Sequence, residues 1–366
     1  MKNTFGNNVA FTLFGESHGE GIGGVLDGLG AGVKIDESYI EKRLTLRRPS
    51  GRISTSRAEK DEYSFISGVF EGYTTGTPIA AVIKNSNVHS SDYSEMKSTA
   101  RPGHADFTGY AKYNGYNDYR GGGHFSGRLT AALVLFGAIA QKALEDKGII
   151  LGTHVSRCAG ISDAPFTDYG KEIPILNDRV FAVLDPEAGK KMTDEIQKAA
   201  DDGDSVGGIL ETAVTGLPAG LGEPFFDTVE GMLSHALFAI PGVKGVEFGD
   251  GFALCDMKGS ESNDPFCVKD GEIKTKTNRM GGINGGITNG MPVVFRTAIK
   301  PTPSIFKEQD TVDFRTGEEI KLSLKGRHDP AIVHRARAVQ DAVASLVLAD
   351  MLVGRYGSDF FGGDGK

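Results

Sequence analysis

Glycine is the feature that most constrains how this chain folds, because it divides the sequence into short segments along its whole length. The chain has 51 glycines among 366 residues, whereas average usage is about 7%. Many stand in turn-like groups such as Gly281-Gly282 and Gly285-Gly286. We therefore expect many backbone positions to need positive φ or a close approach to a ligand or another strand.

Four segments have apolar residues at helical spacing. The predicted helices cover residues 37–48, 128–147, 227–239 and 331–353. Asp36 is a plausible N-cap for the first helix, and Gly148 after the second is typical of a helix C-terminus. For the last helix we predict Asp329 as the cap and Pro330 at the first helical position.

The remaining apolar runs are short and β-like. They cover residues 9–14, 22–26, 79–83, 208–215, 252–257 and 292–299. Because strands and helices do not alternate strictly, the pattern favours an α+β fold over a doubly wound sheet. Length alone suggests roughly two domains, but no Pro/Ser-rich linker divides the chain, and we predict one domain over residues 1–366. Residues 156–205 are the most polar and least patterned, so a surface elaboration is expected there.

Charge and cysteine content narrow the classes of function. With a net charge of −8, the protein should repel DNA, RNA and anionic membranes. Cys158, Cys255 and Cys267 are odd in number and lack CxxC spacing, which argues against a disulfide framework or a zinc site. Since no apolar run has the length of a signal peptide or a membrane span, we expect a cytoplasmic protein without a metal.

A cluster of basic residues stands out in this acidic chain. Its members are Lys42, Arg43, Arg47, Arg48, Arg52 and Arg57. Arg47 and Arg48 end a predicted helix, where cations suit the helix dipole. Arg52 and Arg57 lie beyond Pro49 in a Ser/Thr/Gly-rich loop, which that effect does not explain. Converging guanidinium groups suit a ligand with several carboxylates or phosphates; a solvated surface is the alternative. Because no aromatic residues interleave with the arginines, a small polyanion is favoured over nucleic acid.

Glycine-flanked histidines are the candidates for proton transfer. His18 lies in Gly15-Glu16-Ser17-His18-Gly19, directly after a β-like run, and histidine can donate a proton near neutrality. A structural role for His18 is the alternative. The string is superficially similar to a Gly-x-Ser-x-Gly nucleophile elbow, but no helix follows it. His104, in Arg101-Pro102-Gly103-His104-Ala105-Asp106, repeats the arrangement.

Two further motifs lead into predicted helices. Arg120-Gly121-Gly122-Gly123-His124 comes before the second helix, where free backbone N–H groups suit a phosphate. Lys325-Gly326-Arg327-His328-Asp329 comes before the last helix. The first motif matches neither the P-loop nor the dinucleotide fingerprint, so as a bare pattern it is weak.

Taken together, in this order and spacing, these motifs resemble the chorismate synthase family. The matching segments are residues 14–19, 47–49, 67–72, 74–78, 101–106, 119–123, 204–208, 216–224, 243–247, 285–290, 300–302 and 326–330. The resemblance implies a β-α-β sandwich, usually a homotetramer, that eliminates phosphate from 5-enolpyruvylshikimate 3-phosphate in an anti-1,4 sense to give chorismate. It also implies reduced FMN as cofactor. Because the long insertions of bifunctional members are missing, an external NAD(P)H-dependent reductase is expected to supply it.

The resemblance implies roles for five residues in proton transfer. His18 would be the general acid toward the departing phosphate, with Ser17 nearby. His104 would protonate the reduced flavin, Asp329 would take a proton at its N5 side, and Ser126 would lie near the same ring.

The resemblance also implies two sets of binding residues. The substrate set is Arg43, Arg47, Arg48 and Arg52. The flavin set is His124, Phe125, Ser126, Pro241, Gly242, Gly285, Lys300, Pro301, Thr302, Pro303, Ser304 and Arg327. The chain departs from the usual family pattern at His124-Phe125 and at Asp341, where Glu is usual. No departure removes a proposed catalytic group.

Two functions from other classes stay open on the sequence. One is a non-catalytic flavin- or polyanion-binding protein that retains the fold, although such a protein has no need of the proton-transfer residues. The other is a flavin oxidoreductase that uses the arginines for NADPH phosphate, which would consume reduced pyridine nucleotide without a second enzyme.

Overall fold

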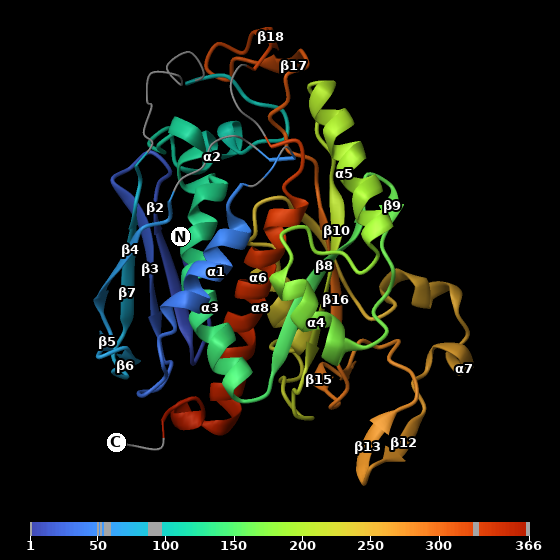
Figure 1. Cartoon of the computed structure of the whole chain (residues 1–366). Coiled ribbons are helices and arrows are strands. Elements are labelled where there is room, and N and C mark those ends of the chain that lie inside the picture. The colour runs from blue at the N-terminus through green and yellow to red at the C-terminus, as the bar shows by residue number, and fades with distance from the viewer. Residues whose placement is uncertain are drawn as a thin grey trace.

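Two five-stranded antiparallel sheets enclose a layer of helices (Figure 1). The computed structural model describes residues 2–49, 51, 53–54, 60–86, 97–324 and 329–363. The first sheet has the order β1 (Thr4–Phe5), β2 (Ala10–Gly15), β3 (Gly21–Asp27), β7 (Ile79–Lys84) and β4 (Tyr63–Ser67). The second has the order β11 (Val243–Phe248), β16 (Val293–Ile299), β10 (Gly208–Thr215), β8 (Ile150–Cys158) and β9 (Ile161–Ser162).

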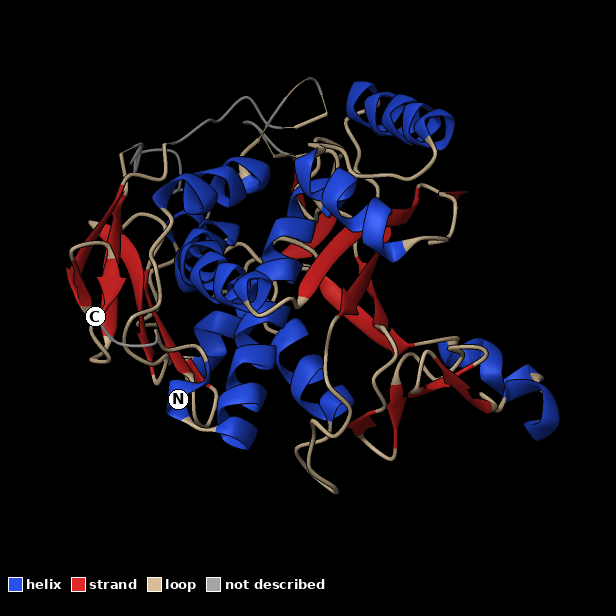
Figure 2. Cartoon of the chain, turned by 60° about the horizontal axis from the view of Figure 1, so that its bottom comes forward, coloured by secondary structure: helices blue, strands red, loops and turns tan. Residues whose placement is uncertain are grey.

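The helices between the sheets form the middle layer, which Figure 2 shows from another side. They are α1 (Glu37–Arg47), α3 (Thr130–Asp146), α6 (Val229–Leu237) and α8 (Val333–Tyr356). Other helical elements are α2 (Asp106–Lys112), α4 (Tyr169–Asp178), α5 (Pro186–Asp201), α7 (Gly259–Ser262), η2 (Arg120–Phe125), η3 (Gly127–Leu129), η4 (Gly251–Asp256) and η5 (Ser358–Phe360). Short hairpins are β5 (Val69–Phe70) with β6 (Tyr73–Thr74), β12 (Phe266–Lys269) with β13 (Glu272–Thr275), β14 (Ile283–Asn284) with β15 (Ile287–Thr288), and β17 (Gln309–Val312) with β18 (Glu319–Leu322).

The core centres on α3 and α8, which cross at very short distance. A Cβ at Gly137 of α3 would lie 2.3 Å from the Cβ of Ala342 in α8, so only glycine permits this approach. Residues Gly127–Asp146 are long and apolar enough to cross a membrane by length and composition alone, but 78% of their apolar window is buried inside the fold. They form the central helix of the sandwich.

The α+β prediction and the β-α-β sandwich are confirmed, and the four predicted helices correspond to α1, α3, α6 and α8. Asp36 caps α1 as predicted, since its Oδ1 accepts from the Tyr39 N–H at 3.0 Å. Gly148 has φ +77° just beyond α3, as the prediction of a helix end requires.

Two local predictions were wrong. Residues 252–257 were predicted as a strand but lie largely in the 3-10 helix η4, and the edge strand β11 comes earlier. Gly249 and Gly251 have positive φ and turn the chain, and Phe252 is exposed, so no core face exists for a strand there. Asp329 does not cap α8, whose N-cap position is Ile332. Its carboxylate instead pairs with Arg335.

Residues 156–205 supply an outer layer on the second sheet. They include the end of β8, β9, α4 and α5, and α4 buries Ile173 and Leu176. This polar segment therefore covers part of the sheet with an amphipathic face.

Candidate functional site

A cavity of about 290 Å³ lies where the first turns of α8 and the start of the α3 region meet the C-terminal end of α1. Five residues to which the sequence assigned roles line it: Ser17, Arg47, Ser126, Pro241 and Asp329. Two arginines that received no role from the sequence, Arg128 and Arg335, also line it. The structure thus brings together residues from both halves of the chain.

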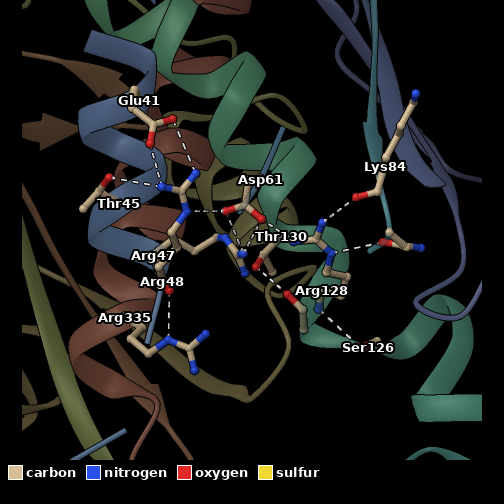
Figure 3. Close-up of polar contacts among 12 residues, drawn as sticks. Glu41, Thr45, Arg47, Arg48, Asp61, Lys84, Ser126, Arg128, Thr130 and Arg335 are labelled. Carbon is tan, nitrogen blue, oxygen red and sulfur yellow. Dashed lines mark hydrogen bonds and ion pairs between the residues drawn. The ribbon is translucent and has the colours of Figure 1, made fainter. Parts of the chain in front are cut away.

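A buried carboxylate joins three of the arginines near the cavity (Figure 3). The Asp61 side chain is fully buried, and both of its oxygens accept from Arg47 Nη2 at 3.1 Å. Arg48 Nε donates to Asp61 Oδ2 at 3.2 Å, and Arg128 Nη1 pairs with Oδ1. Burial alone would raise the pKa of Asp61, but Arg47 and Arg128 hold it below its usual range.

Arg47 is held at one end of its guanidinium group. Its Nε is buried and has no hydrogen-bond partner among the described residues, although its Nη2 is engaged by Asp61. Burial and the neighbouring charges of Arg335 and Arg128 lower the pKa of Arg47, yet an arginine stays protonated in proteins. A buried unpaired donor costs about 1–3 kcal/mol, so an anionic ligand that accepts from it would be stabilised.

Arg128 and Arg335 are fixed by their own partners. Arg128 Nε donates to Asn85 Oδ1 at 3.1 Å, and its backbone N–H donates to Ser126 Oγ at 3.3 Å. Arg335 Nη1 lies 2.5 Å from Asp329 Oδ2, and its Nε donates to the Arg47 carbonyl at 2.8 Å. Each guanidinium group therefore has a set orientation around the cavity.

His18 packs against a turn of three glycines, residues 121–123, called the glycine turn here. Ser17 Oγ lies 3.2 Å from His18 Nδ1 and 3.1 Å from the Gly121 carbonyl oxygen, to which it can donate. Gly121 has φ +56°, and a Cβ there would lie 2.1 Å from His18 Cε1. The His18 ring is buried beside Ser17 and Gly121, both of which line the cavity.

His104 lies against the next glycine of the same turn. A Cβ at Gly122 would lie 3.3 Å from His104 Cε1. His104 Nδ1 is 3.0 Å from Asp106 Oδ1 and 3.1 Å from Arg101 Nη2. Burial would raise the pKa of Asp106, but hydrogen bonds from Arg101 and His104 hold it well below its usual range. The glycine turn thus brings His18 and His104 to adjacent positions.

The residues predicted to bind flavin divide into two groups. Ser126 and Pro241 line the cavity, and Gly242 accepts from the Lys300 N–H at 2.9 Å. Lys300 Nζ donates to the Gly103 carbonyl at 2.7 Å, which ties the segment with Pro301, Pro303 and the buried Ser304 to the His104 loop. Thr302 Oγ1 in this segment is buried without a partner among the described residues. A ligand hydrogen bond would satisfy it.

Three other residues of the flavin set are placed differently. His124 Nδ1 donates to the Gly15 carbonyl at 2.8 Å, and the Phe125 ring lies 6.1 Å from that of Tyr113. Gly285 turns the β14–β15 hairpin. The Thr288 carbonyl of this hairpin accepts from the Gly220 N–H, and the Gly220 carbonyl accepts from Arg355 in the last turn of α8, whereas the first turns of α8 line the cavity. Within one chain, Gly285 therefore lies apart from the cavity.

The clustered arginines of residues 43–57 also differ in where they lie. Arg43 is buried in the core, where it pairs with Asp341 and donates to Asn177 Oδ1 at 3.4 Å. We leave Arg43 out of the substrate set, because Asp341 compensates its charge away from the cavity. Arg48 pairs with Glu41 at 2.6 Å and does not line the cavity. It is linked to the cavity arginines through its ion pair with Asp61. The predictions for Arg52, Arg57 and Arg327 lie outside the described residues.

Comparisons with known proteins agree on one family. The sequence profile described as chorismate synthase matches residues 9–353. The chorismate synthase of Pyrococcus abyssi is 47% identical over 350 residues, covering 96% of this chain and 97% of the relative. That of Methanocella arvoryzae is 46% identical over 352 residues, covering 96% and 94%. A crystal structure described as chorismate synthase is similar with a TM-score of 0.77 and 29% identity, over 97% of this chain and 94% of that one.

Proposed function

The chain belongs to the chorismate synthase family and is a lyase of the shikimate pathway, and we propose that its cavity binds 5-enolpyruvylshikimate 3-phosphate beside reduced FMN. The observation that carries this proposal is the convergence of Arg47, Arg128 and Arg335, from three distant segments, on one cavity. The substrate has one phosphate and two carboxylates. Guanidinium groups bind both kinds of anion through paired hydrogen bonds.

His18 is the proposed general acid toward the departing phosphate. Ser17 Oγ, 3.2 Å from His18 Nδ1, holds the ring at the cavity wall. Because an imidazole titrates near neutrality, a positioned histidine contributes about 10²–10⁴-fold by proton transfer. Ser17 would serve as the hydrogen-bonded neighbour of His18 on the cavity side.

Asp329 is the proposed proton acceptor. Arg335 Nη1, 2.5 Å away, holds its carboxylate against the cavity. His104 is proposed to hold a second proton, on the cofactor side. Its Nδ1 is engaged by Asp106 or Arg101, which leaves Nε2 as the atom that exchanges the proton.

The residues around the cavity fit a flavin. Ser126 and Pro241 of the cavity, together with Gly242 and the adjoining segment from Lys300 through Pro301, Thr302 and Pro303 to Ser304, would hold it. Thr302 Oγ1 is buried without a hydrogen-bond partner among the described residues, which supports a ligand at this segment. When bound, an anionic reduced flavin is the source of electron density for cleavage of the allylic C–O bond. The apolar lining from Ile240, Ile332 and Val339 would keep water out.

We also propose that a separate NAD(P)H-dependent reductase supplies the reduced flavin and that the protein is a cytoplasmic homotetramer. The curated relatives support the first part, since this chain covers 94–97% of those compared above and has no long insertion relative to them.

An anaerobic assay with chemically reduced FMN tests the proposal by following phosphate and chorismate together. We expect equal release of both, and none with oxidised FMN or without flavin. Turnover without reduced flavin would contradict the proposed chemistry. His18→Ala and His104→Ala should each lose at least tenfold in kcat while still binding substrate; unchanged turnover would reject their roles. Steady NADPH consumption by the protein alone would instead favour an oxidoreductase.

A further inference from the structure

Asp61 lies outside the cavity, yet it contacts two of the arginines that line it. It comes just before β4, and its carboxylate is fully buried. We propose that Asp61 is the positioning residue of the substrate-binding arginines, holding Arg47 and Arg128 in the orientation that receives the anionic ligand. The identity of that ligand rests on the proposed function, whereas the positioning rests on the contacts of Asp61 with Arg47 and Arg128.

Asp61 contacts Arg47 and Arg128 directly, and both of these arginines line the cavity. Asp61 occupies Nη2 of Arg47 and Nη1 of Arg128. The other nitrogens of Arg128 donate to Asn85 Oδ1 at 3.1 Å and to the Lys84 carbonyl at 3.3 Å, so this side chain is fixed on three sides (Figure 3). Arg47 has no such second anchor for its Nε, which is buried and unpaired among the described residues. The Asp61 carboxylate therefore links the guanidinium groups of Arg47 and Arg128.

The charges show that Asp61 does not simply neutralise its partners. It is one carboxylate shared by three guanidinium groups, Arg47, Arg48 and Arg128, and Arg48 also pairs with Glu41. One negative charge cannot offset three positive charges, so Asp61 by itself does not cancel the positive field of these arginines beside the cavity. Asp61 reduces the repulsion between Arg47 and Arg128 enough to keep them together.

Neutralisation and positioning predict opposite results when the Asp61 charge is removed. If Asp61 only weakened the positive field, Asp61→Asn would leave the cavity more positive and bind a polyanion more tightly. If Asp61 positions the arginines, the same change lets them separate, and binding weakens although the cavity has gained positive charge. The sign of the change in KM therefore decides between the two.

The test measures steady-state kinetics of Asp61→Asn under anaerobic conditions with reduced FMN. We expect KM for the substrate to rise at least tenfold with kcat within about threefold, because Asp61 contacts the binding arginines Arg47 and Arg128 and does not itself line the cavity. A KM at or below the wild-type value in a folded variant would overturn the proposal. In an Arg47→Ala background the effect of Asp61→Asn should shrink; full additivity would also overturn it.

Asp350→Asn is the matched control for loss of a buried carboxylate. Asp350 is 1% exposed and accepts from the backbone N–H groups of Asn7, Asn8 and Val9 at 2.5–3.0 Å. Its variant should melt at lower temperature with an unchanged KM. If Asp61→Asn does not fold, Asp61→Glu keeps the charge but displaces it, and a raised KM supports positioning while a wild-type KM overturns it.

Inorganic phosphate separates this inference from the proposed function. If the wild-type protein makes no chorismate, the proposed function fails, but positioning can still be measured by thermal melting. Phosphate should raise the melting temperature of the wild-type protein and of Asp350→Asn, and have little effect on Asp61→Asn. An equal rise in all three would overturn the role of Asp61.

Discussion

Gly121→Ala is the most direct test of how the glycine turn serves His18. An alanine at φ +56° costs about 1–2 kcal/mol in backbone strain. For a chain of 366 residues this lowers the melting temperature by only about 1–3 °C. The new Cβ, however, would lie 2.1 Å from His18 Cε1 and 2.3 Å from Nδ1, whereas ordinary contacts begin near 3.4 Å. The ring must therefore move by more than about 1 Å, which costs roughly 100-fold in rate at a catalytic group.

Gly148→Ala is the control, because it carries the same backbone strain without the clash. Gly148 has φ +77°, and a Cβ there meets nothing within 4 Å. By calorimetry both variants should lose the stability that this backbone strain costs, and Gly121→Ala should lose more because of the clash. Only Gly121→Ala should lose kcat in the anaerobic assay. A Gly121→Ala protein with wild-type kcat would refute the placement of the His18 ring or its role as the acid.

Three further changes probe the arginines, the second histidine and acid stability. Arg47→Ala should raise KM at least tenfold with little change in kcat, and a wild-type KM in steady-state kinetics would reject Arg47 as a substrate ligand. Asp106→Asn removes the carboxylate at His104 Nδ1, so kcat should fall roughly tenfold or more with a shifted pH–rate profile; an unchanged profile would separate Asp106 from catalysis. His334→Gln addresses acid unfolding. Burial, with Arg335 and Arg337, lowers the pKa of His334 to about 3, so below pH ~6.5 the unfolded chain binds a proton that the folded protein does not. From pH 7 to 4.5 the wild type should lose about 2–3 kcal/mol more unfolding free energy than the variant in urea titrations; equal losses would contradict this.

The sequence predicted the elements whose pattern is local. Asp36, Gly148 and the apolar spacing of α3 define helix ends and a buried face without reference to the rest of the chain. The second sheet was harder to predict, because β11 contains Gly245 with a register irregularity and β8 was not recognised as a strand. These strands are defined by their pairing partners rather than by their own alternation.

The arginines illustrate what a linear pattern cannot resolve. Arg43 and Arg47 lie one turn apart on the same face of α1, and nothing near them in the sequence distinguishes them. Asp341, almost 300 residues later, captures Arg43 in the core, whereas Arg47 reaches the cavity. Asp61 was missed for the same reason, since its role depends on arginines from two separate segments, Arg47 and Arg48 at the end of α1 and Arg128. The glycines around His18 and His104 gave a usable local signal.

Because the cavity wall includes one arginine from α1, one from η3 just before α3 and one from α8, anion recognition is a property of the completed chain. While α8 is still inside the ribosome, the emerged part of a nascent chain lacks Arg335 and Asp329. It also lacks a central helix of the middle layer. Protection by phosphate against a protease would therefore report that synthesis and folding have both finished, and any fragment ending before residue 329 should remain unprotected at every phosphate concentration.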